Sequence, residues 1–431
     1  MHARNVFGFV MVVAIGVAGH AGAARAAPLG GVYAPCRSYP DTPLAHYQAG
    51  RATRTGTGSS TAYFARGSGT QLTGTVTLSE TGKEYYEVLS ACPLPPGCTR
   101  SLLQPPSGLG LHCRFSVPNQ ALRDYDVHIP NSHTNLTPVP LVMEMHGGGG
   151  GAAPPATEVS SGWRDVSDSS AQPFLVVWPV GSNEAGGPYG EEWQTCNYDN
   201  STAQKPCPAA GYPNDRNFLI EVLKKVVADL KVDRRKVYAA GLSSGAAMVH
   251  TLACKYSQYF AAVAPMATGI QVQAQPRARD NFDLRTNCNP SREVPQFYVH
   301  SPHDDISSYS QGSASVTYWR AKYGCTTATS QSYSSEIDLF DATDAFYPGS
   351  WDTTSCRTTQ CGTSAAPSAV SFCSIDGSSD LLNEHGHIVW YGDDFYFPVV
   401  QPFAPRLAQW AWDWMRSYSL PANPSWPPPL F

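Results

Sequence analysis

The sequence has few charged residues and no cluster of basic ones. Only 15% of its 431 residues are charged, and the 34 acidic residues outnumber the 29 Lys and Arg residues, which gives a formal net charge of −5. No run of more than three Lys or Arg residues is present, which argues against nucleic acid or an anionic lipid surface as a partner. No repeat at a fixed period is visible, so a repeat architecture is not expected.

Long apolar runs are also lacking after the first residues. Arg4 precedes an apolar stretch over residues 6–18, and Ala24-Arg-Ala26 is a small-x-small cleavage site. The apolar stretch is short for a membrane anchor. We therefore interpret residues 1–26 as an export signal cleaved after Ala26, with an uncleaved anchor as the alternative. The mature protein is expected to be secreted and extracellular, without attachment to a membrane.

Cysteine pairs of the Cys-x-x-Cys kind, typical of zinc sites, do not occur. The chain has 12 cysteines, all of them after residue 26. An even number of cysteines in an exported chain indicates a disulfide framework, which we favour over a zinc site. The spacing favours a local bridge between Cys196 and Cys207 and another bridge within residues 92–113.

The organisation of the sequence changes near residue 120. Residues 27–120 are rich in Gly, Ser, Thr and Pro and contain four cysteines, which predicts a β-rich, disulfide-pinned extension. From residue 121 to 431 apolar strands alternate with helices, which predicts an α/β domain with a mostly parallel sheet covered on both faces. We expect strands at 125–129, 140–145, 174–177, 236–240, 261–265 and 296–300, and helices at 217–230, 246–256 and 406–415.

The stretch Gly241-Leu-Ser-Ser-Gly245 fits the pattern G-x-S-x-G. An expected strand precedes it and an expected helix of small residues follows. A serine on such a tight strand-to-helix turn is exposed at the edge of the sheet, and the two glycines leave room for neighbouring backbone. Ser243 is therefore the candidate nucleophile, and an ordinary turn serine is the alternative.

A serine hydroxyl needs a base that removes its proton and an acid that orients the base. In hydrolases with this turn, the acid and then the histidine follow the serine in the chain. Candidate acids are Asp304 and Asp305, directly after the expected strand 296–300, and candidate bases are His385 and His387. The other histidines near strands or on the helix after the serine are expected to have structural roles: His146, His250, His300 and His303.

The negative charge that develops on the substrate needs backbone donors. One candidate donor is the N–H of Ser244. The other is expected in the glycine-rich loop over residues 146–151, where we select Gly148. A phosphate-binding loop is the alternative, but no Gly-Lys-Ser/Thr follows the glycines.

These motifs together resemble the family that groups extracellular polyhydroxybutyrate depolymerases with feruloyl and acetylxylan esterases. Residues 233–248, DRRKVYAAGLSSGAAM, and the later F-A-A at 260–262 are similar to that family's V-D-x-x-R-V-Y-x-x-G-L-S-x-G-x-x-M and F-A-A. Residues 140–147 resemble its oxyanion strand, residues 300–304 its H-G-x-x-D loop, and Gly386-His387 its G-H before a tryptophan.

The resemblance implies an α/β-hydrolase fold and a secreted carboxylic ester hydrolase without metal or cofactor. It selects Asp304 as the acid and His387 as the base, and it implies a polyester or a polysaccharide-linked ester as substrate. A hydroxyalkanoate polyester is our first expectation, and a feruloyl or acetyl ester on plant polysaccharide is the alternative. A secreted peptidase of the same fold and a non-catalytic binding protein are further alternatives.

The sequence departs from the family pattern in several places. Gly148 stands where the family usually has a cysteine, and the spacing from His387 to Trp390 is longer than in the family's G-H-x-W. The segment 326–380 is longer than expected and adds three cysteines. The extension before residue 121 has no recognised counterpart. These departures bear on substrate preference more than on the type of reaction.

Overall fold

The computed structural model describes a set of segments that together cover most of the chain from residue 37 to residue 426. Residue contacts divide the chain into two compact units, one over residues 38–91 and one from residue 92 to the end. The described segments are 37–82, 85–89, 94–101, 108–117, 122–130, 132–133, 137–147, 161–182, 193, 214–272, 282–285, 288–302, 304, 307–325, 327–334, 353–363, 366–376, 404–422, 424 and 426.

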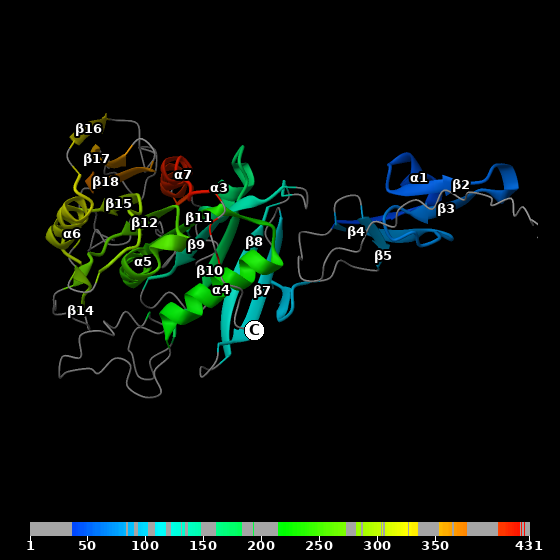
Figure 1. The fold of residues 1–431 in the computed structure, drawn as a ribbon, viewed down its shortest axis with the longest axis horizontal. Coiled ribbons are helices and arrows are strands. Elements are labelled where there is room, and N and C mark those ends of the chain that lie inside the picture. The colour runs from blue at the N-terminus through cyan, green and yellow to red at the C-terminus, as the bar shows by residue number, and fades with distance from the viewer. Residues whose placement is uncertain are drawn as a thin grey trace, which may run out of the picture. The chain divides into compact units, whose positions relative to one another are not determined.

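The smaller unit consists of short strands and one short helix (Figure 1). Three strands pair in the order β1-β4-β5, and β2 and β3 form a separate hairpin. Its core is small and contains Ala52, Ala65, Leu72 and Leu78. The elements are β1 (Arg37–Asp41), α1 (Pro43–Gln48), β2 (Ala52–Thr55), η1 (Gly58–Ser60), β3 (Ala62–Ala65), β4 (Val76–Gly82) and β5 (Tyr85–Val88).

The larger unit is built on an eleven-stranded sheet with the order β16-β17-β18-β15-β12-β11-β9-β10-β8-β7-β6. The six central strands from β18 to β10 are parallel, and the strands outside them pair antiparallel. The strands are β6 (Cys98–Arg100), β7 (Leu109–Ser116), β8 (Leu122–Ile129), β9 (Val139–Met145), β10 (Leu175–Pro179), β11 (Val232–Leu242), β12 (Ala262–Met266), β15 (Gln296–His300), β16 (Thr327–Ser334), β17 (Thr353–Thr363) and β18 (Ala366–Asp376).

Successive residues of the central strands point into two different cores. In β9, Leu141 and Met143 lie in one hydrophobic cluster and Val142 lies in the other. In β11, Val237 belongs to the first cluster and Tyr238 to the second. Because side chains alternate along a strand, strands that are apolar at every position are buried on both faces. The continuous apolar strands of the sequence predicted this arrangement.

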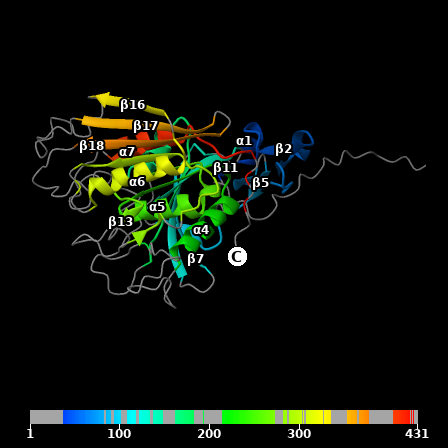
Figure 2. The same cartoon turned by 60° about the vertical axis from the view of Figure 1, so that its left-hand side comes forward.

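Helices cover both faces of the sheet (Figure 1). One face is covered by α4 (Asp215–Asp229), α5 (Ser244–Lys255) and α6 (Tyr309–Lys322), whose apolar side chains share one core cluster. Figure 2 shows these three helices in a row across that face. The other face is covered by α3 (Trp163–Ser169) and α7 (Ala404–Met415). The result is the predicted α/β-hydrolase fold.

The expected helices and strands of the larger unit lie where the periodicity placed them. The predicted helix 217–230 is α4, and the side chain of Asn214 caps it by accepting a hydrogen bond from the N–H of Asn217 at 3.1 Å. The predicted strand 296–300 is β15 with the same bounds. The short helix α3 and the longer helix α6 (Tyr309–Lys322) were not predicted from the sequence.

The sheet extends further at both edges than the sequence indicated. Strands β6 and β7 lie within the predicted extension 27–120, yet they belong to the large sheet: β6 pairs with β7, and β7 pairs with β8. The compact units divide near residue 91, whereas the sequence suggested a change at residue 120. At the opposite edge, the long segment 326–380 supplies β16, β17 and β18, and β18 joins the parallel strands beside β15.

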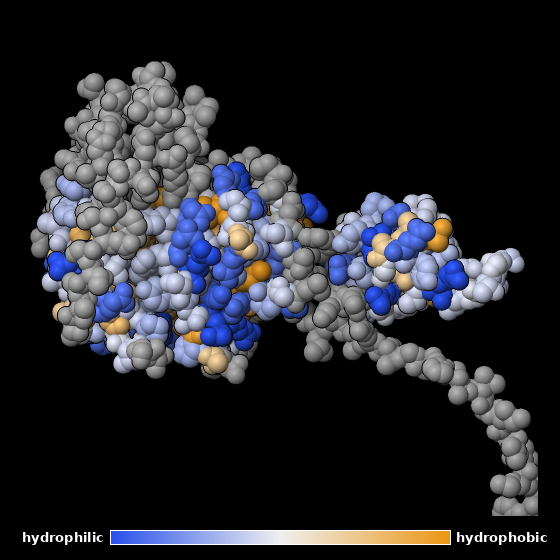
Figure 3. Space-filling model, turned by 90° about the horizontal axis from the view of Figure 1, so that it is seen from above, coloured by the Kyte–Doolittle hydropathy of each residue, from blue (hydrophilic) through white to orange (hydrophobic). Residues whose placement is uncertain are grey.

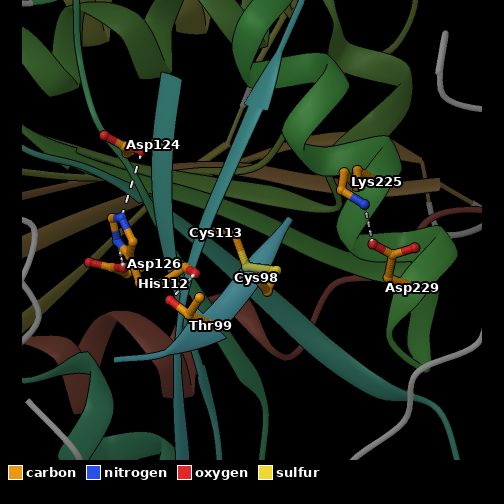
Figure 4. The surroundings of a disulfide bond; sticks show 8 residues. All are labelled: Cys98, Thr99, His112, Cys113, Asp124, Asp126, Lys225 and Asp229. Carbon is orange, nitrogen blue, oxygen red and sulfur yellow. Dashed lines mark hydrogen bonds and ion pairs between the residues drawn. A yellow bond between two sulfur atoms is a disulfide. The ribbon is translucent and has the colours of Figure 1, made fainter. Parts of the chain in front are cut away.

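Four disulfides lie among the described residues. Cys98–Cys113 falls within the window 92–113 predicted to contain a bridge, and it links β6 to β7 (Figure 4). Beside it, the His112 ring lies between Asp124 and Asp126 of β8, and its Nδ1 is 2.8 Å from Asp126 Oδ1. The other described bridges are Cys254–Cys288, Cys325–Cys361 and Cys356–Cys373. The cysteines at 36, 92, 196 and 207 lie outside the described residues, including the predicted pair 196–207.

The described surface of the larger unit is mainly polar. In the view of Figure 3 its coloured residues are mostly hydrophilic, and orange residues form small separate patches. Leu122 is the one large hydrophobic residue of this unit that is strongly exposed among the described residues. Within the same residues, no helix is long and apolar enough to cross a lipid bilayer.

The disulfide Cys254–Cys288 generates a prediction about stability. It joins the last turn of α5 to the segment before β15 and closes a loop of 34 residues. Because a crosslink of this length restricts the unfolded chain, the double variant Cys254→Ala/Cys288→Ala should lose about 3–4 kcal/mol of unfolding free energy. Denaturant unfolding followed by tryptophan fluorescence measures the loss. An unchanged midpoint would show that the bridge does not stabilise the fold.

Candidate active site

Ser243 lies in the sharp turn between β11 and α5. Its backbone has φ 54° and ψ −119°, and Ser243 and Ala267 are the two non-glycine residues with positive φ in the described part of the chain. A residue with a side chain in such a conformation costs about 1–3 kcal/mol and persists only where its surroundings hold it. The Ser243 N–H donates to the Met266 carbonyl at 3.0 Å, and its carbonyl accepts from the Ala247 N–H at 3.1 Å. The turn predicted from G-x-S-x-G is therefore formed at Ser243.

The two glycines of the motif allow β9 to pass close to this turn. A Cβ atom on Gly245 would lie 2.1 Å from the Met145 carbonyl oxygen, and one on Gly241 would lie 2.7 Å from the Gly245 carbonyl carbon. Real Cβ atoms do not approach backbone this closely, so both positions require glycine. Gly147, two residues after the end of β9, also lies near the turn: its Cβ position is 3.6 Å from Ser243 Cβ. The loop that follows β9 therefore begins beside the serine.

The start of α5 offers backbone donors at this turn. The first N–H groups of a helix have no intrahelical acceptor, and they lie at the positive end of the helix dipole. Ser244 is the first residue of α5, and Ser243 makes no side-chain capping hydrogen bond. This arrangement can stabilise negative charge that develops next to the Ser243 hydroxyl.

Asp304 lies in the loop after β15 and is almost fully buried. Its Oδ1 accepts a hydrogen bond from the Ser307 N–H at 2.8 Å, and its Oδ2 is 3.0 Å from His300 Nε2. Strand β15 is separated from β11 by β12 alone, and all three strands are parallel. Since parallel strands end at the same edge of a sheet, Ser243 and Asp304 follow strands that end at one edge.

The remaining predicted site residues lie outside the described residues. These are the predicted base His387, the predicted oxyanion donor Gly148, and the alternatives His385 and Asp305. Their roles stay predictions. Of the five predicted site residues, the structure describes Ser243, Ser244 and Asp304, and it places each of them at or directly after the carboxyl end of a parallel strand.

Three of the four histidines expected to be structural are deeply buried, namely His146, His250 and His300, and His303 lies outside the described residues. His250 on α5 accepts a hydrogen bond from Trp319 Nε1 at 3.2 Å, and its Nε2 is 3.3 Å from the Thr268 carbonyl. Burial lowers the pKa of His250 to about 3, so its ring is neutral. His146, at the end of β9, is also buried, and burial lowers its pKa to about 4.

A buried polar network next to the glycine loop was not predicted from the sequence. Arg123 of β8 donates to Asp215 Oδ1 at 2.6 Å and to the Val180 carbonyl at 2.6 Å. The Ser182 hydroxyl donates to Asp215 Oδ2 at 2.9 Å. These contacts join β8, the loop after β10 and the first turn of α4. The only signal in the sequence was the acidic residue at the start of the predicted helix.

The described residues contain no group of three or more His, Cys, Asp or Glu side chains arranged to hold a metal ion. The described groups of the candidate site are a serine hydroxyl, a buried carboxylate and backbone N–H groups.

Comparison with known proteins gives a family match over the part of the chain that contains these residues. The family described as "Esterase PHB depolymerase" matches residues 124–337. A bifunctional acetylxylan esterase/xylanase of Neocallimastix patriciarum is 24% identical over 204 residues, which cover 47% of this chain and 24% of that protein. Feruloyl esterase B of Piromyces equi is 24% identical over 194 residues, which cover 44% of this chain and 31% of that protein. The chain thus spans less than a third of the length of these curated relatives.

The chain is also similar to two solved structures of esterases. The region shared with a thermostable esterase covers 90% of this chain and 94% of that chain, with 13% identity and a TM-score of 0.44. The region shared with an acetyl xylan esterase from Aspergillus awamori covers 63% of this chain and 95% of that chain, with 15% identity and a TM-score of 0.41.

The close approach at Gly245 generates a prediction with a matched control. Gly245→Ala should lower the free energy of unfolding by about 1–3 kcal/mol or more, because its methyl group would meet the Met145 carbonyl and overpack the turn. Gly147→Ala adds a methyl group near the same turn, but this group would make only ordinary contacts, the nearest at 3.6 Å. The variant should therefore lose much less unfolding free energy. Chemical unfolding of both variants measures the difference. Equal losses of unfolding free energy in the two variants would show that the Met145 carbonyl does not constrain residue 245.

Proposed function

We propose that this chain, which belongs to the esterase family of the polyhydroxybutyrate depolymerases, is a secreted serine hydrolase of carboxylic esters. The observation that carries the proposal is the backbone of Ser243, which is held in a left-handed conformation between β9 and β12 at the start of α5. This conformation presents a serine side chain at the edge of the sheet and places helix N–H groups beside it. The apolar N-terminal stretch and the disulfides support secretion.

In the proposed reaction Ser243 Oγ attacks the ester carbonyl, and His387 accepts the hydroxyl proton. The N–H groups of Ser244 and Gly148 stabilise the oxyanion of the tetrahedral intermediate. His387 then returns the proton to the leaving alkoxide, and the acyl group remains on Ser243. A water molecule, deprotonated by His387, attacks the acyl carbonyl. His387 then returns this proton to Ser243 Oγ as the bond to the acyl group breaks, which releases the carboxylic acid and restores the serine. Asp304 holds the imidazole in the required tautomer throughout, and the hydrogen bond from the Ser307 N–H fixes its Oδ1.

The proposed substrate is an ester of a polymer. The family description supports a hydroxyalkanoate polyester as the first candidate. The similarity to an acetylxylan esterase and to a feruloyl esterase favours a second candidate, an acetyl or feruloyl ester carried by plant polysaccharide. No metal or cofactor takes part in either reaction, because the serine, the histidine and the backbone donors supply the nucleophile, the proton transfer and the charge stabilisation.

Replacing the serine tests the proposed reaction directly. Ser243→Ala should abolish hydrolysis of a p-nitrophenyl ester and covalent labelling by a fluorophosphonate, while unfolding remains cooperative, because only one hydroxyl group is lost. Ser313→Ala, an exposed position on α6, is the control and should keep both activities. Persistent labelling in the Ser243→Ala protein would refute the assignment of the nucleophile.

The two candidate bases are separated by a pair of variants. His387→Ala should reduce kcat by several orders of magnitude, similar to Ser243→Ala, because the members of a triad act as a unit. His385→Ala should reduce kcat by about tenfold at most, as expected for a residue that only supports the site. If His385→Ala matches the serine variant and His387→Ala retains most of the activity, the two roles are exchanged.

The substrate class is decided by the products released. Incubated with films of polyhydroxybutyrate, the purified protein should release hydroxybutyrate oligomers at a rate that disappears in Ser243→Ala. Parallel incubations with arabinoxylan and acetylated xylan test the second candidate, with ferulate and acetate as the measured products. Release from the polysaccharides but not from the films would overturn the polyester assignment and leave the esterase assignment intact.

A further inference from the structure

His146 connects the glycine loop to the loop after β10, and the proposed reaction gives it no role. It is the residue directly after β9, and its side chain is almost fully buried. The Gly181 N–H donates a hydrogen bond to His146 Nε2 at 2.9 Å. On the other side of the ring, His146 Nδ1 is 2.7 Å from the carbonyl oxygen of Gly147. Both ring nitrogens are therefore bound to backbone groups.

These two contacts define the tautomer of the ring. Because Nε2 accepts the Gly181 N–H, it carries no proton in the neutral ring, and the single proton lies on Nδ1. Nδ1 therefore donates to the Gly147 carbonyl. A neutral ring agrees with the burial of His146, which lowers its pKa to about 4. A protonated ring would lose the contact with the Gly181 N–H.

The hydrogen bond to Gly147 has a consequence for the next peptide group. The Gly147 carbonyl and the Gly148 N–H belong to the same peptide unit, and in a planar trans peptide they point in opposite directions. A side chain that fixes the carbonyl therefore fixes the direction of this N–H as well. Gly147 itself is adjacent to the turn at Ser243, since its Cβ position is 3.6 Å from Ser243 Cβ.

We propose that His146 is a positioning residue for the oxyanion site: its Nδ1–H holds the Gly147 carbonyl and thereby fixes the plane of the peptide group that carries the proposed oxyanion donor, the N–H of Gly148. This inference rests on the proposed ester hydrolysis, in which Gly148 is an oxyanion donor. His146 touches neither the substrate nor the reacting atoms. It acts through the orientation of one peptide group.

The surroundings of His146 hold the ring in place. Trp193 Nε1 donates to the His146 carbonyl at 2.8 Å, and the centroids of the two rings are 4.8 Å apart. Gly181 lies between Val180 and Ser182, which accept from Arg123 and donate to Asp215, respectively. The buried Arg123–Asp215 pair thus fixes the backbone that donates to His146 Nε2. An orienting side chain needs such support, because a small displacement of an oxyanion donor is costly for catalysis.

Two substitutions separate positioning from packing. His146→Asn keeps an N–H donor near the place of Nδ1 and loses the acceptor for Gly181, whereas His146→Gln keeps an acceptor near the place of Nε2 and loses the donor to Gly147. If His146 positions the oxyanion peptide, His146→Gln should lower kcat by about 100-fold with little change in KM, as does the loss of one oxyanion donor. His146→Asn should remain within about tenfold of the wild-type kcat.

Two further measurements make the result specific. The affinity for an arylboronic acid, which forms a tetrahedral adduct with the serine, should fall in parallel with kcat in His146→Gln, because the adduct needs the same donors. His128→Gln is the matched control: this buried histidine of β8 contacts Asp168 at 2.9 Å, and its loss should reduce stability without reducing kcat. Thermal unfolding of all variants provides the stability scale.

The inference is overturned if the kcat values of His146→Gln and His146→Asn fall equally, or only in proportion to their loss of stability. It is also overturned if His146→Gln keeps the wild-type kcat and boronate affinity. Failure of the proposed function is distinguishable from these outcomes. In that case Ser243→Ala would retain hydrolysis and labelling, whatever the His146 variants show.

Discussion

The left-handed backbone of Ser243 depends on two neighbouring strands, and the arrangement of the site follows from it. Met266 at the end of β12 accepts the Ser243 N–H. The end of β9 leaves residue 245 no room for a side chain, and the backbone of Gly245 in turn leaves residue 241 none. These contacts compensate a conformation that costs about 1–3 kcal/mol in isolation. They also bring three neighbouring parallel strands together at the residue that the proposed reaction uses. Stability and chemistry are therefore coupled at this point.

The other groups of the site are supplied by loops that leave the same edge of the sheet. Asp304 follows β15, and its carboxylate is held by the Ser307 N–H and by His300. Gly147 follows β9 and is held by His146. In both loops a buried histidine binds a group next to the proposed chemistry without taking part in it. Such support keeps a site within the narrow geometry that catalysis requires.

The network behind His146 extends this support to distant parts of the chain. Arg123 and Asp215 are 92 residues apart and form a buried ion pair that also binds the loop after β10. Removing one partner of such a pair leaves an uncompensated buried charge, which typically costs about 3–5 kcal/mol. The helix α4, the antiparallel strand β8 and the His146 ring are thereby held in one arrangement.

The sequence by itself determined the elements with strong local patterns. The apolar stripe of residues 217–230 predicted α4, the apolar run 296–300 predicted β15, and the spacing of Gly241, Ser243 and Gly245 predicted the turn that the structure shows. These features depend on residues that are close in the chain, so periodicity and motif spacing reveal them. The α/β-hydrolase fold followed from the order of these elements and from the resemblance.

Only the tertiary structure decided which distant segments meet. It brought β6 and β7 into the large sheet and placed β18 beside β15. It also paired Arg123 with Asp215 and placed the Gly181 N–H on the ring of His146, which the sequence had presented as a histidine beside a strand. The reason is physical: strand partners and buried hydrogen bonds are selected by the packing of the whole sheet and its helices, and a polar residue carries no local signal of the partner that it will find in the folded chain.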